Sequence, residues 1–115
     1  MKLPNHTDAF IPQEKIIGYL LSSTHHEGRS KAAFFTRYGF SVWHWEDLDA
    51  ALRRYAADHD VVRLDDSPFG TRPIIEGILT APDGRAPFVR SVWFIEIGEC
   101  VPRLVTSYPL RRRLP

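Results

Sequence analysis

The sequence lacks the cysteines that a disulfide framework or a cysteine-ligated metal cluster requires, because Cys100 is its single thiol. A lone thiol is typical of a reducing compartment, so we expect a cytoplasmic protein. No apolar run approaches the roughly 20 residues of a membrane-spanning helix. The first residues, which include Asn5, His6 and Asp8, are not typical of a secretory signal. We therefore expect no membrane association.

An excess of charge of one sign is also missing. The chain has 15 Lys and Arg against 14 Asp and Glu, a net charge of +1. This balance does not by itself predict attraction of the whole molecule to nucleic acid, whose ligands are often clearly basic. The main local departure is a basic C-terminal cluster, Arg111, Arg112 and Arg113. Three arginines can contact phosphate, but a run this short is more typical of a solvated tail.

The residues that are present suit one folded domain. The chain has 115 residues, of which 43% are hydrophobic and 12% aromatic, which is ordinary for a globular core. No repeat, low-complexity segment or Pro/Gly/Ser-rich linker divides it. We predict a single domain over residues 1–109, followed by a basic tail over residues 110–115.

The first half of the chain has the periodicity of helices. A first helix is expected from Pro12, whose missing N–H costs nothing in a first turn, and a second covers Ser30–Tyr38 and stops at Gly39. A third follows Ser41 as N-cap and ends near His59. Its apolar residues recur at a spacing of three and four, which predicts a buried stripe. The stripe consists of Trp45, Leu48, Leu52, Tyr55 and Ala56.

After Asp60 the period becomes that of extended chain. Short runs rich in β-branched and aromatic residues are separated by turn signals, of which Pro82-Asp83-Gly84 is the clearest. The predicted strands cover residues 61–64, 72–80, 88–97 and 103–108. Four successive strands with short connections favour an antiparallel meander. The predicted fold class is therefore α+β, with N-terminal helices packed on a four-stranded antiparallel β-meander.

The third strand leaves two orientations open. Arg90 alternates with Phe88, Val92 and Phe94, and an arginine on an apolar face is costly unless it is paired or lies at a site. The other orientation makes Val89, Trp93, Ile95 and Ile97 the core face and turns Arg90 outward. Thr106 and Tyr108 share a face of the last strand because they are two residues apart. If Gly98 and Pro102 are opposed, Phe94 faces Thr106, Val92 faces Tyr108, and Arg90 joins both hydroxyls on one face. If Ile97 opposes Pro102 instead, every pairing slips by one and Arg90 points away. We predict the first register.

Several segments of the chain resemble a family of small uncharacterised bacterial domains, which occur alone and as C-terminal toxin modules of polymorphic toxins. The segments carrying the resemblance occur in the same order as in that family. They are GRSKAAFF (28–35) with GF (39–40), SPFGTR (67–72), PDGR (82–85), VRSVW (89–93) and PRLVTSYP (102–109). The likeness covers nearly the whole chain, and VRSVW with PRLVTSYP is its most specific part.

These domains resemble the barnase–EndoU–colicin–RelE superfamily of metal-independent ribonucleases, in which helices pack on a four-stranded antiparallel sheet. The resemblance implies a toxin domain that cleaves RNA without a cofactor and is paired with a cognate antitoxin or immunity protein. Such cleavage needs a base for the 2′-hydroxyl, a cation for the phosphorane and an acid for the 5′-oxygen.

The resemblance also implies which residues carry the chemistry. His25 matches the family motif three residues before Gly28, and Lys31 lies in the next helix. Histidine can act as acid or base near neutral pH, and lysine and arginine neutralise phosphate. The implied catalytic residues are His25, Lys31, Arg90, Thr106 and Tyr108. The implied substrate-binding residues are His26, Arg29 and Arg103, and it stays open which of the two histidines acts.

The same residues allow other interpretations. His25 and His26 could be solvated loop residues, and Lys31 a surface lysine packed on an aromatic ring. His44 and His59 have no partner at metal-ligand spacing, so no metal site is expected. Trp43, Trp45 and Trp93 are predicted to be core anchors. The rival functions are a non-catalytic protein-binding module, such as an antitoxin, an immunity partner or an inactive toxin relative, and a housekeeping domain.

Overall fold

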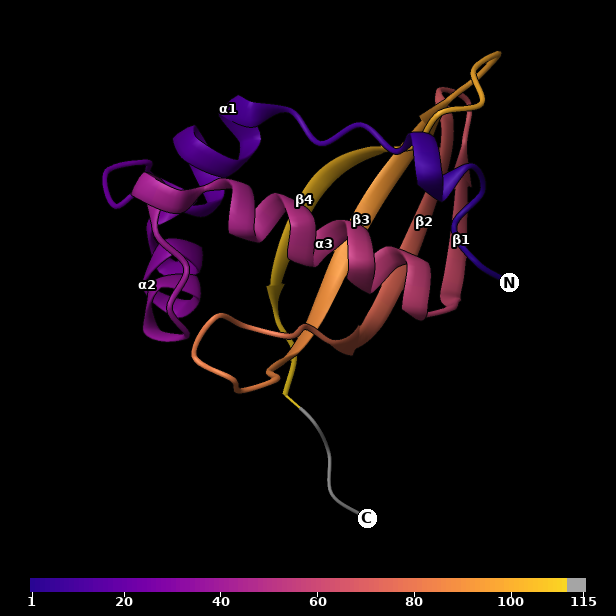
Figure 1. Cartoon of the computed structure of the whole chain (residues 1–115). Coiled ribbons are helices and arrows are strands. Elements are labelled where there is room, and N and C mark those ends of the chain that lie inside the picture. The colour runs from indigo at the N-terminus through magenta and orange to yellow at the C-terminus, as the bar shows by residue number, and fades with distance from the viewer. Residues whose placement is uncertain (112–115) are drawn as a thin grey trace.

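The computed structural model describes residues 1–111, and the predicted α+β fold is confirmed. A helical N-terminal half is followed by one four-stranded antiparallel sheet in the order β1-β2-β3-β4 (Figure 1). The strands are β1 (Val61–Ser67), β2 (Gly70–Ile78), β3 (Phe88–Glu96) and β4 (Arg103–Pro109). Among residues 1–111, no helix is both long and apolar enough to cross a membrane. The predicted tail lies largely outside the described residues, which include neither Arg112 nor Arg113.

The predicted first helix is a composite of two helical types. α1 (Gln13–Lys15) runs directly into η2 (Ile16–Leu20), a π-helical turn in which the Leu21 N–H donates to the Ile16 carbonyl at 2.8 Å. A one-turn 3-10 helix, η1 (His6–Asp8), precedes them. Isolated π turns often lie at functional sites, so this one marks the first helix for closer inspection.

The second helix begins and ends close to its predicted limits, whereas the third ends as predicted but begins later, at Glu46. α2 covers Arg29–Arg37, and Gly39 follows it with φ of 100°, a left-handed conformation that glycine adopts without strain. α3 covers Glu46–Asp58. Ser41 does cap a helix as predicted, but that helix is a separate 3-10 turn, η3 (Val42–His44), where the Ser41 hydroxyl accepts a hydrogen bond from the Trp43 N–H.

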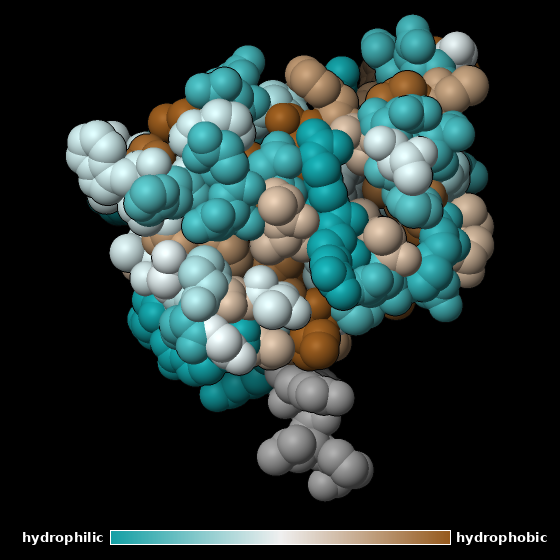
Figure 2. Space-filling model, in the orientation of Figure 1, coloured by the Kyte–Doolittle hydropathy of each residue, from teal (hydrophilic) through white to brown (hydrophobic). Residues whose placement is uncertain are grey.

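α3 lies across one face of the sheet, here called the inner face, while α1 and α2 lie beside β4 (Figure 1). The core lies between α3 and the inner face. Leu48 and Leu52, two residues of the predicted stripe of α3, are in one buried cluster with Trp93 of β3, and Trp45 packs at its border. The opposite side of α3 presents mainly hydrophilic side chains (Figure 2). The face of the sheet away from α3 is called the outer face below.

The prediction that Trp43 is a core anchor is wrong, because its side chain is 87% exposed. The 3-10 turn before α3 changes the helical phase, so Trp43 points to solvent while Trp45, two residues later, packs on the core. The first strand is also longer than predicted. It continues through Asp65 and Asp66 to Ser67, because both aspartates pair with β2.

Tyr55 joins α3 to the sheet and provides a test of the core. Its hydroxyl donates toward the carbonyls of Ile75 (2.8 Å) and Val89 (2.9 Å), and burial raises the pKa of this phenol. We expect Tyr55→Phe to lower the free energy of unfolding by about 1 to 2 kcal/mol at pH 7. The wild type should also lose stability above about pH 10, where an unfolded tyrosine ionises but the folded Tyr55 stays neutral.

Urea titrations at pH 7, 9 and 11 measure both effects. Between pH 9 and 11, Tyr55→Phe should lose less stability than the wild type, because this linked ionisation has been removed. Identical losses in the two proteins would contradict the assignment.

Candidate functional site

The candidate site lies on the outer face, where the N-terminal helices meet β4. The hydroxyl of Tyr19 in η2 is 3.2 Å from the Thr106 hydroxyl in β4, which links residues 87 positions apart. Thr106 and Tyr108 lie on the same face as Arg90, because Val92 pairs with Thr106 and Arg90 pairs with Tyr108. The strand pairing therefore places the guanidinium of Arg90 and the hydroxyls of Thr106 and Tyr108 on one face of the sheet. Tyr19 of the helical half reaches this face through its contact with Thr106.

A glycine makes the close approach of the helices possible. A Cβ at Gly28 would lie 2.1 Å from the Tyr19 carbonyl oxygen, nearer than any side-chain atom can come. Only glycine lets the start of α2 touch η2 here. This contact lets Lys31, three residues further along, reach the ring of Tyr19.

Two lysines flank the Tyr19 ring. The Nζ atoms of Lys15 and Lys31 are 4.9 Å and 5.3 Å from the ring centroid, within cation–π distance. Lys31 also donates to the Glu27 carbonyl at 3.3 Å. Neither lysine has a carboxylate within ion-pair distance in the described part of the chain. Both charges are therefore available to an anion.

Arg90 forms the third cationic group and is held in place by two partners. Its Nε and one terminal nitrogen donate to the same Glu76 oxygen at 2.8 Å and 2.6 Å, and the other terminal nitrogen donates to the Tyr108 hydroxyl at 3.2 Å. The bond to Tyr108, followed by that to Glu76, raises the pKa of Arg90 above its ordinary value. The core orientation left open by the sequence is thus decided: Val89 and Trp93 are buried, and Arg90 points outward. Ile97, which was included in that core face, lies beyond the end of β3 and is 71% exposed, so this part of the prediction is wrong.

We call Lys15, Tyr19, Lys31, Arg90, Thr106 and Tyr108 the β4 cluster. A shallow pocket of about 470 Å³ beside it is lined by Ser30, Lys31, Tyr108 and Pro109. Cations and hydroxyl donors around an open pocket are a suitable environment for a phosphate group.

His25 lies beside the β4 cluster in a defined orientation. Its ring contacts the Tyr19 ring edge-on, with centroids 5.0 Å apart. Its Nδ1 accepts hydrogen bonds from the backbone N–H groups of Glu27 and Gly28, each at 3.0 Å. In the neutral ring the proton is therefore on Nε2, which can donate a hydrogen bond. This arrangement suits hydrogen bonding to an anionic oxygen.

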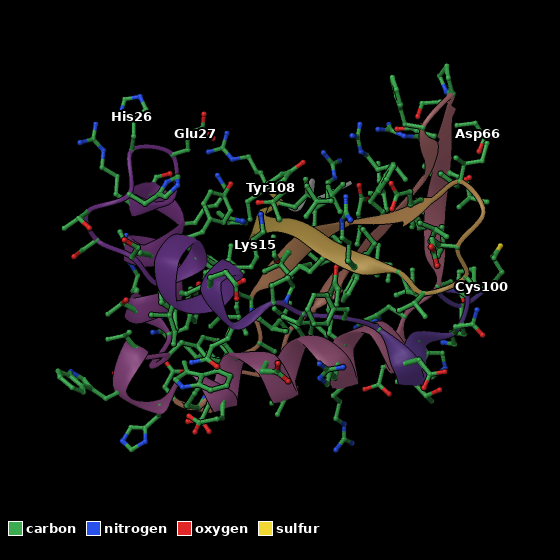
Figure 3. All side chains as sticks on the ribbon, turned by 90° about the horizontal axis from the view of Figure 1, so that it is seen from above. Lys15, His26, Glu27, Asp66, Cys100 and Tyr108 are labelled. Atoms are coloured by element: carbon green, nitrogen blue, oxygen red, sulfur yellow. The ribbon has the colours of Figure 1, made fainter. Side chains whose placement is uncertain are left out.

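The three predicted substrate-binding residues lie outside the β4 cluster. His26 projects from the loop before α2 into solvent (Figure 3). Arg29 lines a different groove on α2, together with Thr36 and Arg37. Arg103 lies at the other end of β4, with its guanidinium 5.3 Å from the centroid of the Phe94 ring. The structure brings the five predicted catalytic residues into one region and leaves these three apart.

Three residues of this region were not singled out from the sequence. Lys15 and Tyr19 are four residues apart, a spacing that places them on one side of a helix. No motif or spacing in the sequence marks Glu76 as a site residue, because its role depends on its pairing with Arg90 in the neighbouring strand. In residues 1–111, no three His, Cys, Asp or Glu side chains gather closely enough to hold a metal ion.

Comparison with known proteins gives a family and a fold. Residues 2–111 match the profile of the family described as "Domain of unknown function (DUF6883)". A solved structure described as "Contact-dependent growth inhibition toxin - immunity protein complex from Klebsiella pneumoniae 342" contains a similar chain. The TM-score is 0.70 at 16% identity, over 93% of this chain and 97% of that chain, which indicates a shared fold. No curated protein matches the sequence.

Proposed function

The chain belongs to the DUF6883 family, and on that premise we propose that it is a toxin-like domain that cleaves RNA without a metal ion. The observation that carries this proposal is the β4 cluster, in which Lys15, Lys31 and Arg90 surround three hydroxyl groups beside an open pocket. The fold shared with a chain of a toxin–immunity protein complex supports a toxin role and a protein partner. We propose a cognate antitoxin or immunity protein as that partner.

The proposed reaction is an attack of the RNA 2′-oxygen on the adjacent phosphorus. A new P–O2′ bond forms while the P–O5′ bond breaks, which leaves a 2′,3′-cyclic phosphate and a 5′-hydroxyl. Arg90, Lys31 and the hydroxyls of Thr106 and Tyr108 would stabilise the charge that accumulates on the phosphorus oxygens. Tyr19 and Lys15 complete this environment at the helical side.

Two proton transfers accompany the reaction. Glu76 would accept the 2′-hydroxyl proton, because one of its carboxylate oxygens has no hydrogen-bond partner in residues 1–111 while the other is held by Arg90. His25 would donate a hydrogen bond from Nε2 to the departing 5′-oxygen, which takes its proton from a water molecule, while the proton on Glu76 passes to the solvent. A positioned general base contributes about 10²- to 10⁴-fold to a rate.

The test is incubation of the purified domain with total RNA in EDTA, with detection of 2′,3′-cyclic phosphate ends. We expect cleavage by the wild type and about tenfold slower cleavage by Lys31→Ala at low salt. The variant should also have a shallower dependence of binding on salt, by about one phosphate contact. Arg37→Ala, on the same helix but in the other groove, is the matched control and should cleave like the wild type. No cleavage by the wild type would refute the proposal.

A second candidate function is a non-catalytic protein-binding module, such as an immunity partner. The observation that favours it is an apolar tip formed by two hairpins, where Phe69 and Ile97 are 74% and 71% exposed and the Ile97 N–H donates to the Phe69 carbonyl at 2.9 Å. Exposed apolar groups of this size often mark a protein contact. A wild type that binds a cognate partner but leaves RNA intact would establish this function instead.

A further inference from the structure

We propose that a second pocket on this domain binds a nucleobase of the RNA strand whose phosphate lies at the β4 cluster, and that it prefers bases with an exocyclic amino group. This inference rests on the proposed function. The pocket, called the distal pocket, has a volume of about 270 Å³ and lies at the opposite end of β4. It is lined by Phe10, Phe94, Glu96, Glu99, Val101 and Arg103.

One wall of the distal pocket is a cation on an aromatic ring. Arg103 and Phe94 are paired across β3 and β4, and the guanidinium lies over the ring. A Cβ at Gly70 would come within 2.8 Å of the Phe94 ring, so the glycine makes room for the ring against β2. Aromatic rings and guanidinium planes are the surfaces on which unpaired bases stack.

The facing wall is held by the backbone. Phe10 forms a short parallel bridge to Arg103, in which the Phe10 N–H donates to the Pro102 carbonyl at 2.8 Å and its carbonyl accepts from the Leu104 N–H at 2.9 Å. The Phe10 side chain is nevertheless 57% exposed. An apolar ring that is fixed in position but left open to solvent is suited to contact a flat ligand.

The remaining lining supplies hydrogen-bond acceptors. Glu96 and Glu99 have no basic partner within ion-pair distance in residues 1–111. An ionised carboxylate can only accept hydrogen bonds. It can therefore bind the exocyclic amino group of cytosine, adenine or guanine, whereas uracil offers only its ring N3–H, which lies between two carbonyl oxygens that repel a carboxylate. This chemistry selects against uracil.

The spacing between the two sites sets the length of RNA that can bind both. Arg103 and Tyr108 are five residues apart on β4, which at about 3.3 Å per residue is roughly 17 Å. A stacked nucleic-acid strand advances about 3.4 Å per nucleotide and an unstacked strand more. The span thus corresponds to about three to five nucleotides, so a mononucleotide cannot occupy both sites.

The test measures binding of 2′-O-methyl hexanucleotides of C, A and U at one fixed salt concentration. These probes lack the attacking hydroxyl and stay intact. We expect the C or the A hexamer to bind about tenfold more tightly than the U hexamer. Glu96→Gln/Glu99→Gln should reduce this ratio to below about twofold, because an amide can also donate to uracil. The control Glu27→Gln, an exposed carboxylate in the loop before α2, should keep the wild-type ratio.

Arg103→Ala provides the second arm, because this exposed change leaves the core intact. It should weaken hexamer binding about fivefold or more and leave binding of a 3′-mononucleotide at the β4 cluster unchanged. Equal binding of the C, A and U hexamers, or a ratio unaffected by Glu96→Gln/Glu99→Gln, would overturn the proposal. If the hexamers are discriminated but the wild type does not cleave RNA in EDTA, the base-binding role of the distal pocket stands and the proposed reaction is refuted. If the wild type cleaves RNA but does not discriminate the hexamers, the proposed reaction stands and the base-binding role is refuted.

Discussion

Arg90→Ala is expected to lower the rate of RNA cleavage about 100- to 1000-fold, the usual cost of losing one preorganised donor to a transition state. Arg90 is the cation fixed most firmly in the β4 cluster, because Glu76 and Tyr108 hold three of its nitrogens. Arg90→Lys should rescue little of this activity, since a lysine cannot bond a carboxylate and a hydroxyl through a rigid fork. Initial rates at saturating RNA measure the effect.

Loss of Arg90 also leaves Glu76 without its partner, so a fall in activity could reflect a damaged fold. Arg90→Lys separates the two causes, because it leaves Glu76 in place and keeps a cation beside it. It should restore most of the stability, because a half-buried carboxylate without a cation is the destabilising group. Activity should stay low in this variant. Recovery of cleavage together with stability would contradict a catalytic role for the guanidinium fork.

Leu52→Ala is expected to lower the free energy of unfolding by about 2 to 5 kcal/mol, the range for a large-to-small change in a packed core. Leu52 is 0% exposed and belongs to the cluster that joins α3 to Trp93 of β3. The close packing around it cannot collapse onto the missing atoms, so the lost transfer energy and the cavity both contribute. The free energy of unfolding of a whole domain is typically about 5 to 15 kcal/mol, so this loss is a large share of it.

Urea unfolding followed by tryptophan fluorescence measures this loss. Arg54→Ala is the matched control on the same helix, because the Arg54 side chain is 82% exposed and its ion pair with Asp58 is 3.6 Å long. Its effect should stay within about 0.5 kcal/mol. A Leu52→Ala change below that value would show that α3 packs through a different face.

The candidate site was predictable where it depends on the alternation of side chains along a strand. Arg90, Thr106 and Tyr108 were predicted to share a face, and the observed pairing confirms it. The individual partners were not predicted correctly. Phe94 was expected to face Thr106, but it pairs with Arg103, and the register changes between Val92 and Trp93. Because side chains alternate with a period of two, a shift of two residues preserves the face while changing every partner.

Residues brought together from distant parts of the chain were harder to predict. Lys15 and Tyr19 join the site through a π turn and through the contact that Gly28 permits, and neither is visible as a periodic pattern. Glu76 depends on a strand partner 14 residues away. Such contacts follow from how whole elements pack, so the local sequence contains little information about them.

The sequence by itself determined the fold class, the helices and strands with most of their limits, the core stripe of α3 and the shared face of Arg90, Thr106 and Tyr108. These features depend on periodicity, capping and turn residues, which act over a few neighbouring positions. Only the tertiary structure decided that Arg90 points outward to Glu76, that Trp43 is exposed, and that Tyr19 meets Thr106 between two lysines. Those outcomes depend on the docking of the helices against the sheet, where packing between distant segments outweighs local preference.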